Sequence, residues 1–362
     1  MRRRELIASK TSDGPYLAFT ALESGTFTLT IPANVGTSYI ESISYSTDEG
    51  VTWTTTNNTS SAVTITTPTI SEGDTVLWKG NSKSISIADY ESVFSSTGNF
   101  NVSGNIMSLL YGDNFSDKTS FPSETVRPFA GLFKNCTKLK SIENLILPAT
   151  ALASFCYFSL FQGCTSLTEI PSNLLLPVTT LASGCYRSMF QGCTSLVTVP
   201  TDMLQATIMS EHCYEYMFKG CSKLTNVPNL PATSLNSFCY SSMFQDCTSL
   251  TTVPTGLLPA TTLKEYCYRS MFDGCSKLTQ TPYLPAVTLA NGCYAQMFAK
   301  CYKLKKIYCK AVFNKSTETT KYTHEWVYNV YETGNFYKNS SSDWATGVNG
   351  IPSNWTVNTY PS

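Results

Sequence analysis

The chain has 362 residues, of which 42% are hydrophobic and only 14% are charged. This length and apolar content suffice for a sizeable core, which excludes global disorder. The 25 basic and 25 acidic residues give a net charge of zero, which argues against a nucleic-acid partner. No stretch approaches the roughly 20 apolar residues of a membrane span, so we expect no membrane insertion.

Residues 1–14 form a basic N-terminal arm that carries Arg2, Arg3 and Arg4. No apolar run typical of a secretion signal follows the arginines. The sequence therefore predicts a protein that folds in the cytoplasm where it is made.

Residues 15–90 have the pattern of a compact β domain. The segment from Phe19 to Ile31 alternates apolar and polar residues, as at Phe27 to Ile31, which is the pattern of a half-buried strand. Short strands separated by Gly, Asn and Ser turns are typical of an immunoglobulin-like sandwich. Further strands are predicted at residues 43–45, 51–55, 63–67 and 75–79.

Residues 46–53 match the Asp-box pattern Ser-x-Asp-x-Gly-x-x-Trp, which is familiar from sialidase propellers. In such a hairpin Asp48 accepts turn amides, Gly50 supplies an unusual backbone angle and Trp53 plugs the core. A single copy cannot build a propeller, so we interpret these three residues as structural.

Residues 91–135 are expected to cap the open end of the array that follows, because a bare array end exposes apolar surface and unpaired backbone. The first strand pairs of this cap are predicted at residues 100–102 and 106–110.

Residues 136–313 repeat a motif of the type Phe-x-Gly-Cys-x-x-Leu with a period of 26 to 29 residues. A Cys-Tyr pair precedes the motif in six copies, and a Pro-rich link separates the copies. This period lies within the leucine-rich-repeat range, and stacking of such units creates one continuous core. The motif cysteines that follow the first copy are Cys164, Cys193, Cys221, Cys247, Cys275 and Cys301.

Each repeat is predicted to contain a helical turn and a strand. Leu263, Cys267, Met271 and Phe272 stand at helical spacing, and the Cys-Thr-Ser-Leu segment that runs on to a proline reads as the strand. The fold class predicted from the sequence is therefore mainly β, with an immunoglobulin-like sandwich followed by a leucine-rich-repeat solenoid of about seven coils with terminal caps.

The repeat resembles the BspA-like leucine-rich repeat, named for the Bacteroides surface protein, over roughly residues 129–310. The hallmark shared with that family is an Ala-Phe or Met-Phe step followed by x-Gly-Cys-x-x-Leu. Two departures are the first copy, which lacks the Cys-Tyr pair, and Asp246, which replaces the usual glycine. The resemblance implies a surface-binding module, since family members are generally adhesins of gut Bacteroidetes, and phages of these bacteria, including crAss-like phages, encode similar arrays.

The 14 cysteines are interpreted as reduced, buried, small apolar residues. Zinc needs closely grouped ligands, and no Cys-x-x-Cys occurs. Equivalent cysteines of stacked coils have parallel side chains, which is poor geometry for a disulfide. The six tyrosines that follow the first cysteines are expected to pack between coils rather than to form an exposed stripe for sugar rings.

Residues 314–362 are expected to close the other end of the array. Trp326, Trp344 and Trp355 appear after the repeat stops. The stretch looks like the aromatic C-terminal closure of similar Bacteroidetes and phage repeat proteins, and we prefer a capping role to a ligand pocket.

The sequence offers no recognisable catalytic arrangement. Its two histidines, His212 and His324, lie in no nucleophile-and-acid pattern, and there is no phosphate loop or calcium loop. We therefore expect no enzyme activity, no cofactor and no metal.

Two settings fit these observations. The first is a phage virion fibre or surface-decoration protein on the virion surface, and the alternative is a bacterial cell-surface adhesin. The apparent lack of a secretion signal favours the virion, where the arm and β domain would contact other virion proteins and the repeats would contact a host-surface glycan or protein. Fibre proteins are often trimeric, so a homotrimer is one assembly that this interpretation allows. The predicted binding positions are the exposed strand residues that differ between copies, namely Glu169, Thr198, Asn226, Thr252 and Gln280.

Overall fold

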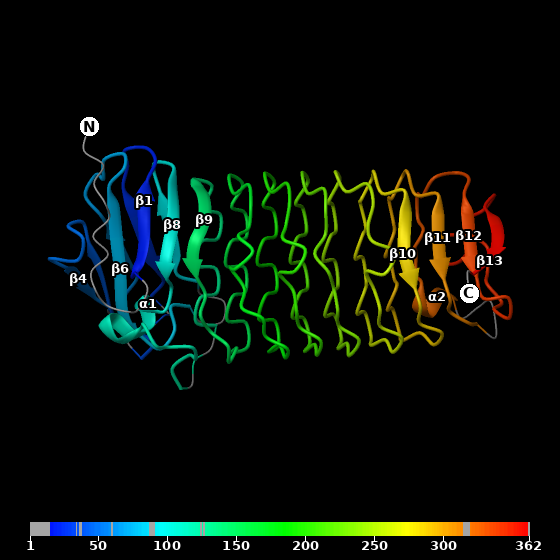
Figure 1. The fold of residues 1–362 in the computed structure, drawn as a ribbon, viewed down its shortest axis with the longest axis horizontal. Helices are drawn as coiled ribbons and strands as arrows, with labels where there is room; N and C mark the ends of the chain where they lie inside the picture. Colours follow the sequence, from blue (N-terminus) through cyan, green and yellow to red (C-terminus); the bar gives the residue numbers. More distant parts are fainter. Residues whose placement is uncertain are drawn as a thin grey trace.

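The computed structural model describes residues 15–360 except positions 34, 36–37, 59–60, 87–90, 124, 126 and 314–318. The basic arm at residues 1–14 therefore lies outside the described residues. The described chain is mainly β with several sheets, and the molecule is long: strands occupy both ends and a stack of coils fills the middle (Figure 1).

The first sheet has six strands in the order β4-β3-β6-β1-β8-β9. The predicted strands of the N-terminal region are confirmed, with small shifts at their ends. There are two exceptions. The alternating segment from Phe19 to Ile31 is divided between the two strands β1 and β2. The segment that begins at Val51 enters β4 only at Thr54. The bounds in this sheet are β1 Leu17–Ala21, β3 Ile40–Ser46, β4 Thr54–Asn57, β6 Thr75–Ser82, β8 Phe100–Asn105 and β9 Leu139–Ile146.

A second sheet of three strands, in the order β5-β2-β7, packs against the first. Its strands are β2 (Phe27–Ile31), β5 (Val63–Thr66) and β7 (Val93–Ser96). The ring of Phe19 in β1 lies 5.4 Å from that of Phe27 and 4.7 Å from that of Phe94, both on the second sheet. Aromatic contacts of this kind fill the space between the two sheets.

The segment expected to cap the array shares its sheets with the N-terminal strands. Strand β7 pairs antiparallel with β2, and β8 pairs antiparallel with β1. On its other edge β8 pairs in parallel with β9, so the six-stranded sheet runs directly into the first repeat.

The prediction of a strand at residues 106–110 is wrong. A turn at Ile106 and Met107 leads into the short helix α1 (Ser108–Tyr111), followed by the 3-10 helix η1 (Gly112–Asn114). The Ser108 hydroxyl donates to the Trp78 carbonyl and accepts from the Leu17 amide, which fixes this turn against β6 and β1.

Residues 127–313 form a repeat stack, in which each coil has a turn side and an extended side. On the turn side successive backbone N–H groups donate alternately to the next coil and to their own coil. The Tyr157 amide donates to the Cys185 carbonyl of the next coil at 3.0 Å, whereas the Phe158 amide donates to the Phe155 carbonyl of its own coil at 3.1 Å. Every fourth residue adopts a left-handed conformation, as at Phe155 (φ 56°), Ser159 (φ 54°) and Gly163 (φ 73°).

The predicted helical turn is therefore wrong. An α-helix keeps all of its N–H groups within one segment and excludes recurrent left-handed residues. Here half of the turn-side donors serve the neighbouring coil, so no coil satisfies its own backbone alone.

The extended side differs from the prediction as well. Of the described coils only the terminal ones contain strands here, namely β9, β10 (Gln280–Leu284) and β11 (Lys306–Cys309). In the middle coils the Pro-rich chain runs extended with sparse cross-coil bonds, such as Thr225 N–H to the Val197 carbonyl at 2.9 Å. Proline has no N–H to donate, so it interrupts a continuous ladder.

Rows of identical side chains form the core of the repeat stack. Phe190, Phe218 and Phe244 are fully buried, with successive ring centroids 5.8 Å apart and nearly parallel planes. The Cys-Tyr tyrosines form a parallel row, with Tyr186 and Tyr214 at 5.9 Å.

The C-terminal end closes with a parallel sheet in the order β10-β11-β12-β13. Helix α2 (Thr319–Tyr322) precedes strands β12 (Asn335–Lys338) and β13 (Thr356–Thr359). Trp326 is fully buried against the last members of both aromatic rows, 6.3 Å from Tyr294 and 6.1 Å from Phe298.

Candidate functional site

The five predicted binding positions do not form one uniform exposed row. Glu169, Thr198 and Thr252 are exposed on the extended side. Asn226 is half-buried because its side chain bonds the Val199 amide at 3.0 Å and the Val199 carbonyl at 2.8 Å. Gln280 is also half-buried, since it lies in β10 and pairs with Lys306 of β11. The expectation that all five are exposed is therefore wrong for these two residues.

The motif cysteines contribute cross-coil hydrogen bonds. The thiol of Cys164 donates to the Phe133 carbonyl of the preceding coil at 3.1 Å, and that of Cys221 donates to Phe190 at 3.2 Å. The remaining motif cysteines repeat this contact at 3.1 to 3.3 Å: Cys193, Cys247, Cys275 and Cys301. All 14 cysteines are buried and free in the structure.

Burial also determines the chemistry of these thiols. It raises the pKa of Cys221 and of Cys239 to about 12, because the charged thiolate would lose its hydration. A thiol of this kind is a poor nucleophile at neutral pH. The arrangement therefore suits packing and cross-coil bonding.

The Cys-Tyr tyrosines are not available to a ligand. Tyr157, Tyr240 and Tyr268 are each 1% exposed, and their hydroxyls have no hydrogen-bond partner among the described residues. Burial raises the pKa of these phenols well above the ordinary value of 10.

The hairpin between β3 and β4 has the internal bonds of an Asp-box. Asp48 accepts from the Thr52 amide at 2.9 Å and from the Thr52 hydroxyl at 2.6 Å. Gly50 has a φ of 88° and donates to the Ser46 hydroxyl at 2.9 Å.

Trp53 does not plug the core as the motif predicts. Its side chain is half-buried at the surface, where the ring lies 5.1 Å from that of Tyr16 and beneath the Lys79 ammonium at 4.1 Å. Its indole N–H donates to the Gly50 carbonyl at 3.1 Å. The core between the sheets is filled instead by Trp78, which is fully buried.

The two histidines lie far apart in the chain, and each contacts a different set of residues. His212 Nδ1 lies 2.7 Å from Glu215, and its ring stacks on that of Phe238 at 4.9 Å. His324 is exposed and lies 3.8 Å from Glu325. Within the described ranges no group of three or more His, Cys, Asp or Glu side chains could hold a metal ion.

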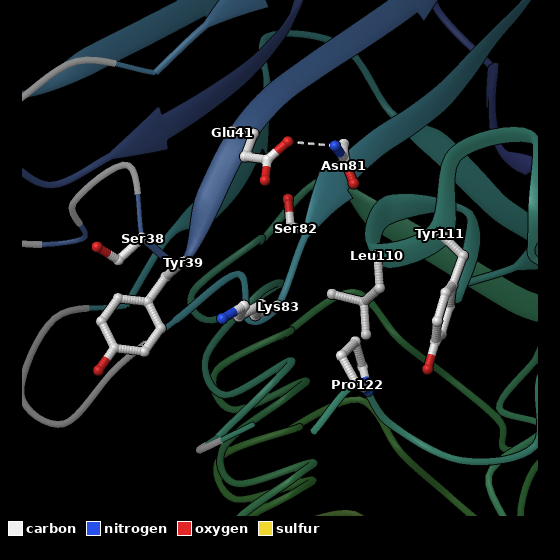
Figure 2. A pocket seen from close by; sticks show the side chains of 9 residues that line it. All are labelled: Ser38, Tyr39, Glu41, Asn81, Ser82, Lys83, Leu110, Tyr111 and Pro122. Atoms are coloured by element: carbon white, nitrogen blue, oxygen red, sulfur yellow. Dashed lines mark hydrogen bonds between the residues drawn. The ribbon is translucent and has the colours of Figure 1, made fainter. Parts of the chain in front are cut away.

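One surface hollow of about 220 Å³ is lined by residues of β3, β6 and α1 and by neighbouring loop residues (Figure 2). Figure 2 shows Glu41 and Asn81 beside each other, joined by a hydrogen bond. Leu110 and Pro122 line the opposite side, as the same view shows. Glu41 and Asn81 thus bond each other, and the mixed lining defines no ligand chemistry.

A second hollow, of about 350 Å³, lies on the turn side of the first coils of the repeat stack. Four equivalent positions, each directly after a row phenylalanine, contribute Lys134, Gln162, Gln191 and Lys219. We name this hollow the cationic groove. It is lined by Lys134, Phe158, Ser159, Gln162, Arg187, Ser188, Gln191, Tyr216 and Lys219.

Sequence reasoning missed the cationic groove because it treated the turn side as a helix and looked for variation only on the extended side. The available signal was the position after each row phenylalanine, which is Lys, Gln, Gln, Lys, Gln, Asp and Ala in successive copies.

Comparisons with protein-family models, curated proteins and solved structures find no match for this chain. Among the described residues no helix is both long enough and apolar enough to cross a membrane.

Proposed function

We propose that this chain is a non-enzymatic binding or display protein. In this proposal the repeat stack is a BspA-like leucine-rich-repeat solenoid, and the two N-terminal sheets form an immunoglobulin-like sandwich. The observation that carries the proposal is the repeat stack itself: an invariant aromatic core holds the coils in register while the outward side chains differ from copy to copy. A rigid scaffold with a variable surface is the usual arrangement of repeat proteins that bind other molecules.

The chemistry of the candidate residues supports binding over catalysis. The cysteines are buried thiols with raised pKa values, and His212 contacts Glu215 at 2.7 Å and stacks on Phe238. The cationic groove presents amides, cations and aromatic rings, which recognise a ligand without transforming it.

The setting we propose is a phage virion, with the chain as a fibre or surface-decoration protein. The resemblance of the repeats to BspA-like arrays supports this setting, since phages of Bacteroidetes encode similar arrays. The N-terminal arm and sheets would contact other virion proteins, and the repeats would face a host-surface glycan or protein. The alternative is a bacterial cell-surface adhesin, which the same resemblance also supports.

Immunogold electron microscopy with an antibody to the repeat stack separates these settings. Gold on purified phage particles is the expected result, and its position on head or tail distinguishes decoration from host attachment. Gold on uninfected bacterial surfaces, with none on particles, would replace the virion by the adhesin.

A further inference from the structure

The cationic groove has an excess of positive charge. Lys134, Arg187 and Lys219 line it, and its lining includes no carboxylate. Lys134 is paired with Glu91 at 2.6 Å and Arg187 with Glu215 at 2.9 Å, whereas Lys219 has no ion pair among the described residues. The groove therefore favours an anionic ligand.

Arg187 is held in place at the middle of the groove. Its Nε atom faces the Glu215 carboxylate, whose side chain is only 5% exposed. The guanidinium also lies 5.8 Å from the Phe158 ring and 5.7 Å from the Tyr216 ring. Because one carboxylate and two rings fix its position, its remaining N–H donors are preorganised for a carboxylate or sulfate group.

Several hydrogen-bonding groups in the groove are unused. The side-chain amides of Gln162 and Gln191 form no hydrogen bond within the described chain, and each offers both donors and acceptors. The Ser159 hydroxyl is fully buried and also has no partner there. Because this hydroxyl is fully buried, the glutamine amides are the groups of the groove that a ligand with hydroxyl groups can reach.

The equivalent positions further along the repeat stack are different. Gln245 and Asp273 occupy two of these positions, and Gln245 donates to Asp273 at 2.9 Å. Asp273 is also paired at 3.4 Å with Lys300, which lies one position further along its own coil. In these later coils Gln245 is therefore paired within the stack, and Asp273 adds a carboxylate. The equivalent Gln162 and Gln191 of the cationic groove are left without a partner among the described residues.

We propose that the cationic groove binds an acidic saccharide, meaning a sugar that carries a carboxylate or a sulfate. The anionic group would pair with Arg187 and Lys219, the hydroxyls would bond the glutamine amides, and the apolar face of the ring would lie against Phe158 or Tyr216. The volume of about 350 Å³ is at the lower end of the roughly 300–1,000 Å³ typical of ligand sites, which suits one or two sugar residues. This inference rests on the proposed binding function and names the ligand class for it.

The test is isothermal titration calorimetry of the full chain with four probes. These are a galacturonic acid trisaccharide, the galactose trisaccharide of the same linkage, a sulfated galactose trisaccharide, and inorganic sulfate. We expect at least one acidic trisaccharide to bind at least tenfold more tightly than the neutral one. The carboxylated and sulfated probes show which anionic group is preferred.

The variants are Lys219→Gln, which breaks no ion pair, and Lys223→Gln, an exposed lysine of the same coil outside the groove, as the matched control. Loss of one charge-assisted contact should weaken acidic-saccharide binding by about tenfold in Lys219→Gln. Lys223→Gln should bind as the parent chain does. Arg187→Gln and Arg269→Gln form a second pair at equivalent coil positions, with circular dichroism to check that Arg187→Gln folds.

Equal binding of the neutral and acidic trisaccharides, or equal behaviour of Lys219→Gln and Lys223→Gln, would overturn the inference. So would inorganic sulfate that binds as tightly as the acidic trisaccharides, because that result describes a simple anion site. Binding of the parent chain to host cells that survives Lys219→Gln and Arg187→Gln would sink this inference and leave the proposed function intact. Failure of the parent chain to bind any cell would remove the proposed function itself.

Discussion

At the scale of single residues, the cysteines illustrate how one side chain serves two purposes in this chain. Each motif cysteine after the first copy fills a small space in the core and also donates to a phenylalanine carbonyl of the preceding coil, as Cys247 does to Phe218 at 3.3 Å. The thiol is small enough for the row and is a weak donor. Serine would donate more strongly but lose apolar character, and alanine would leave the carbonyl with one bond fewer.

The first prediction concerns thiol reactivity. The native chain should react very slowly with a thiol reagent such as Ellman's reagent at pH 8, because burial raises the thiol pKa values to about 12 or above and blocks access. In denaturant without reductant, all 14 thiols should react. Fewer than about ten reactive thiols in the denatured chain would mean that disulfides form.

The second prediction concerns Asp48. Bonds from Thr52 and Ser46 lower the pKa of this carboxyl from 3.8 to about 2. A group with a lowered folded-state pKa stabilises the folded state above its unfolded pKa, and this contribution is lost as the pH falls toward the folded value. The stability difference between the parent chain and Asp48→Asn, measured by urea unfolding, should therefore shrink between pH 4 and about pH 2. A difference that stays constant over this window would show that the carboxylate charge does not matter to the hairpin.

At the scale of elements, the turn side of the coil is the unusual feature. It alternates bonds within the coil and bonds to the next coil, and it places residues such as Ser188 (φ 57°) and Gly220 (φ 74°) in the left-handed region. Non-glycine residues in this region cost roughly 1–2 kcal/mol. The cross-coil hydrogen bonds and the aromatic rows must offset that cost, so a single coil should not keep this conformation alone.

The third prediction tests the left-handed requirement at Gly220. A Cβ at this position would meet only Gly192, at 3.7 Å or more, so the effect of substitution is conformational rather than steric. Gly220→Val should destabilise the chain by roughly 2 kcal/mol, whereas Gly220→Asn should cost less because asparagine tolerates the left-handed region. The comparison is made on urea unfolding midpoints, and equal costs for the two variants would contradict the assigned conformation.

The fourth prediction concerns the phenylalanine row. Phe218→Ala removes a fully buried ring between Phe190 and Phe244 and should cost roughly 3–5 kcal/mol. Val197→Ala, at an exposed position on the extended side, should change stability by less than about 0.5 kcal/mol. Thermal or urea unfolding measures both, and similar losses for the two variants would argue against the row as the main core.

Local patterns in the sequence predicted the N-terminal strands well, because alternation and turn residues act over a few positions. Strand β2 and the hairpin around Asp48 are examples. The sequence pattern predicted a helix on the turn side, which is wrong. A coil with a left-handed residue at every fourth position spaces its apolar residues, such as Leu263, Cys267 and Met271, nearly as a helix does. The cationic groove depends on which coils are neighbours in space, and that information lies outside any one repeat.

At the scale of the whole molecule, the chain is one elongated body with an uninterrupted path of backbone pairing. Strand β8 belongs to the N-terminal sheet and also pairs with β9 of the first coil. At the other end β11, β12 and β13 continue the stack in parallel pairing (Figure 1). An outward surface that spans many coils is therefore held at fixed spacings, which suits an extended or multivalent ligand.

The fifth prediction concerns the C-terminal closure. Deletion of residues 319–362 would uncover Phe298 and Ile307, which are fully buried in the complete chain, and would leave β11 as an edge strand without its partner β12. An exposed apolar edge of this kind promotes association. Size-exclusion chromatography with light scattering should show aggregates for the truncated chain under conditions that suit the parent chain. A monodisperse truncated chain would show that the closure is dispensable.

The central claim, that the repeat stack displays a binding surface, is tested most directly by saturation binding of the fluorescently labelled chain to intact Bacteroidetes cells. The proposal predicts saturable binding at micromolar protein or below, with loss of binding when outward residues of the repeat stack are replaced and the core is left intact. Absence of binding to every strain tested, with the chain shown to be folded, would contradict the claim and leave a structural decoration without a ligand.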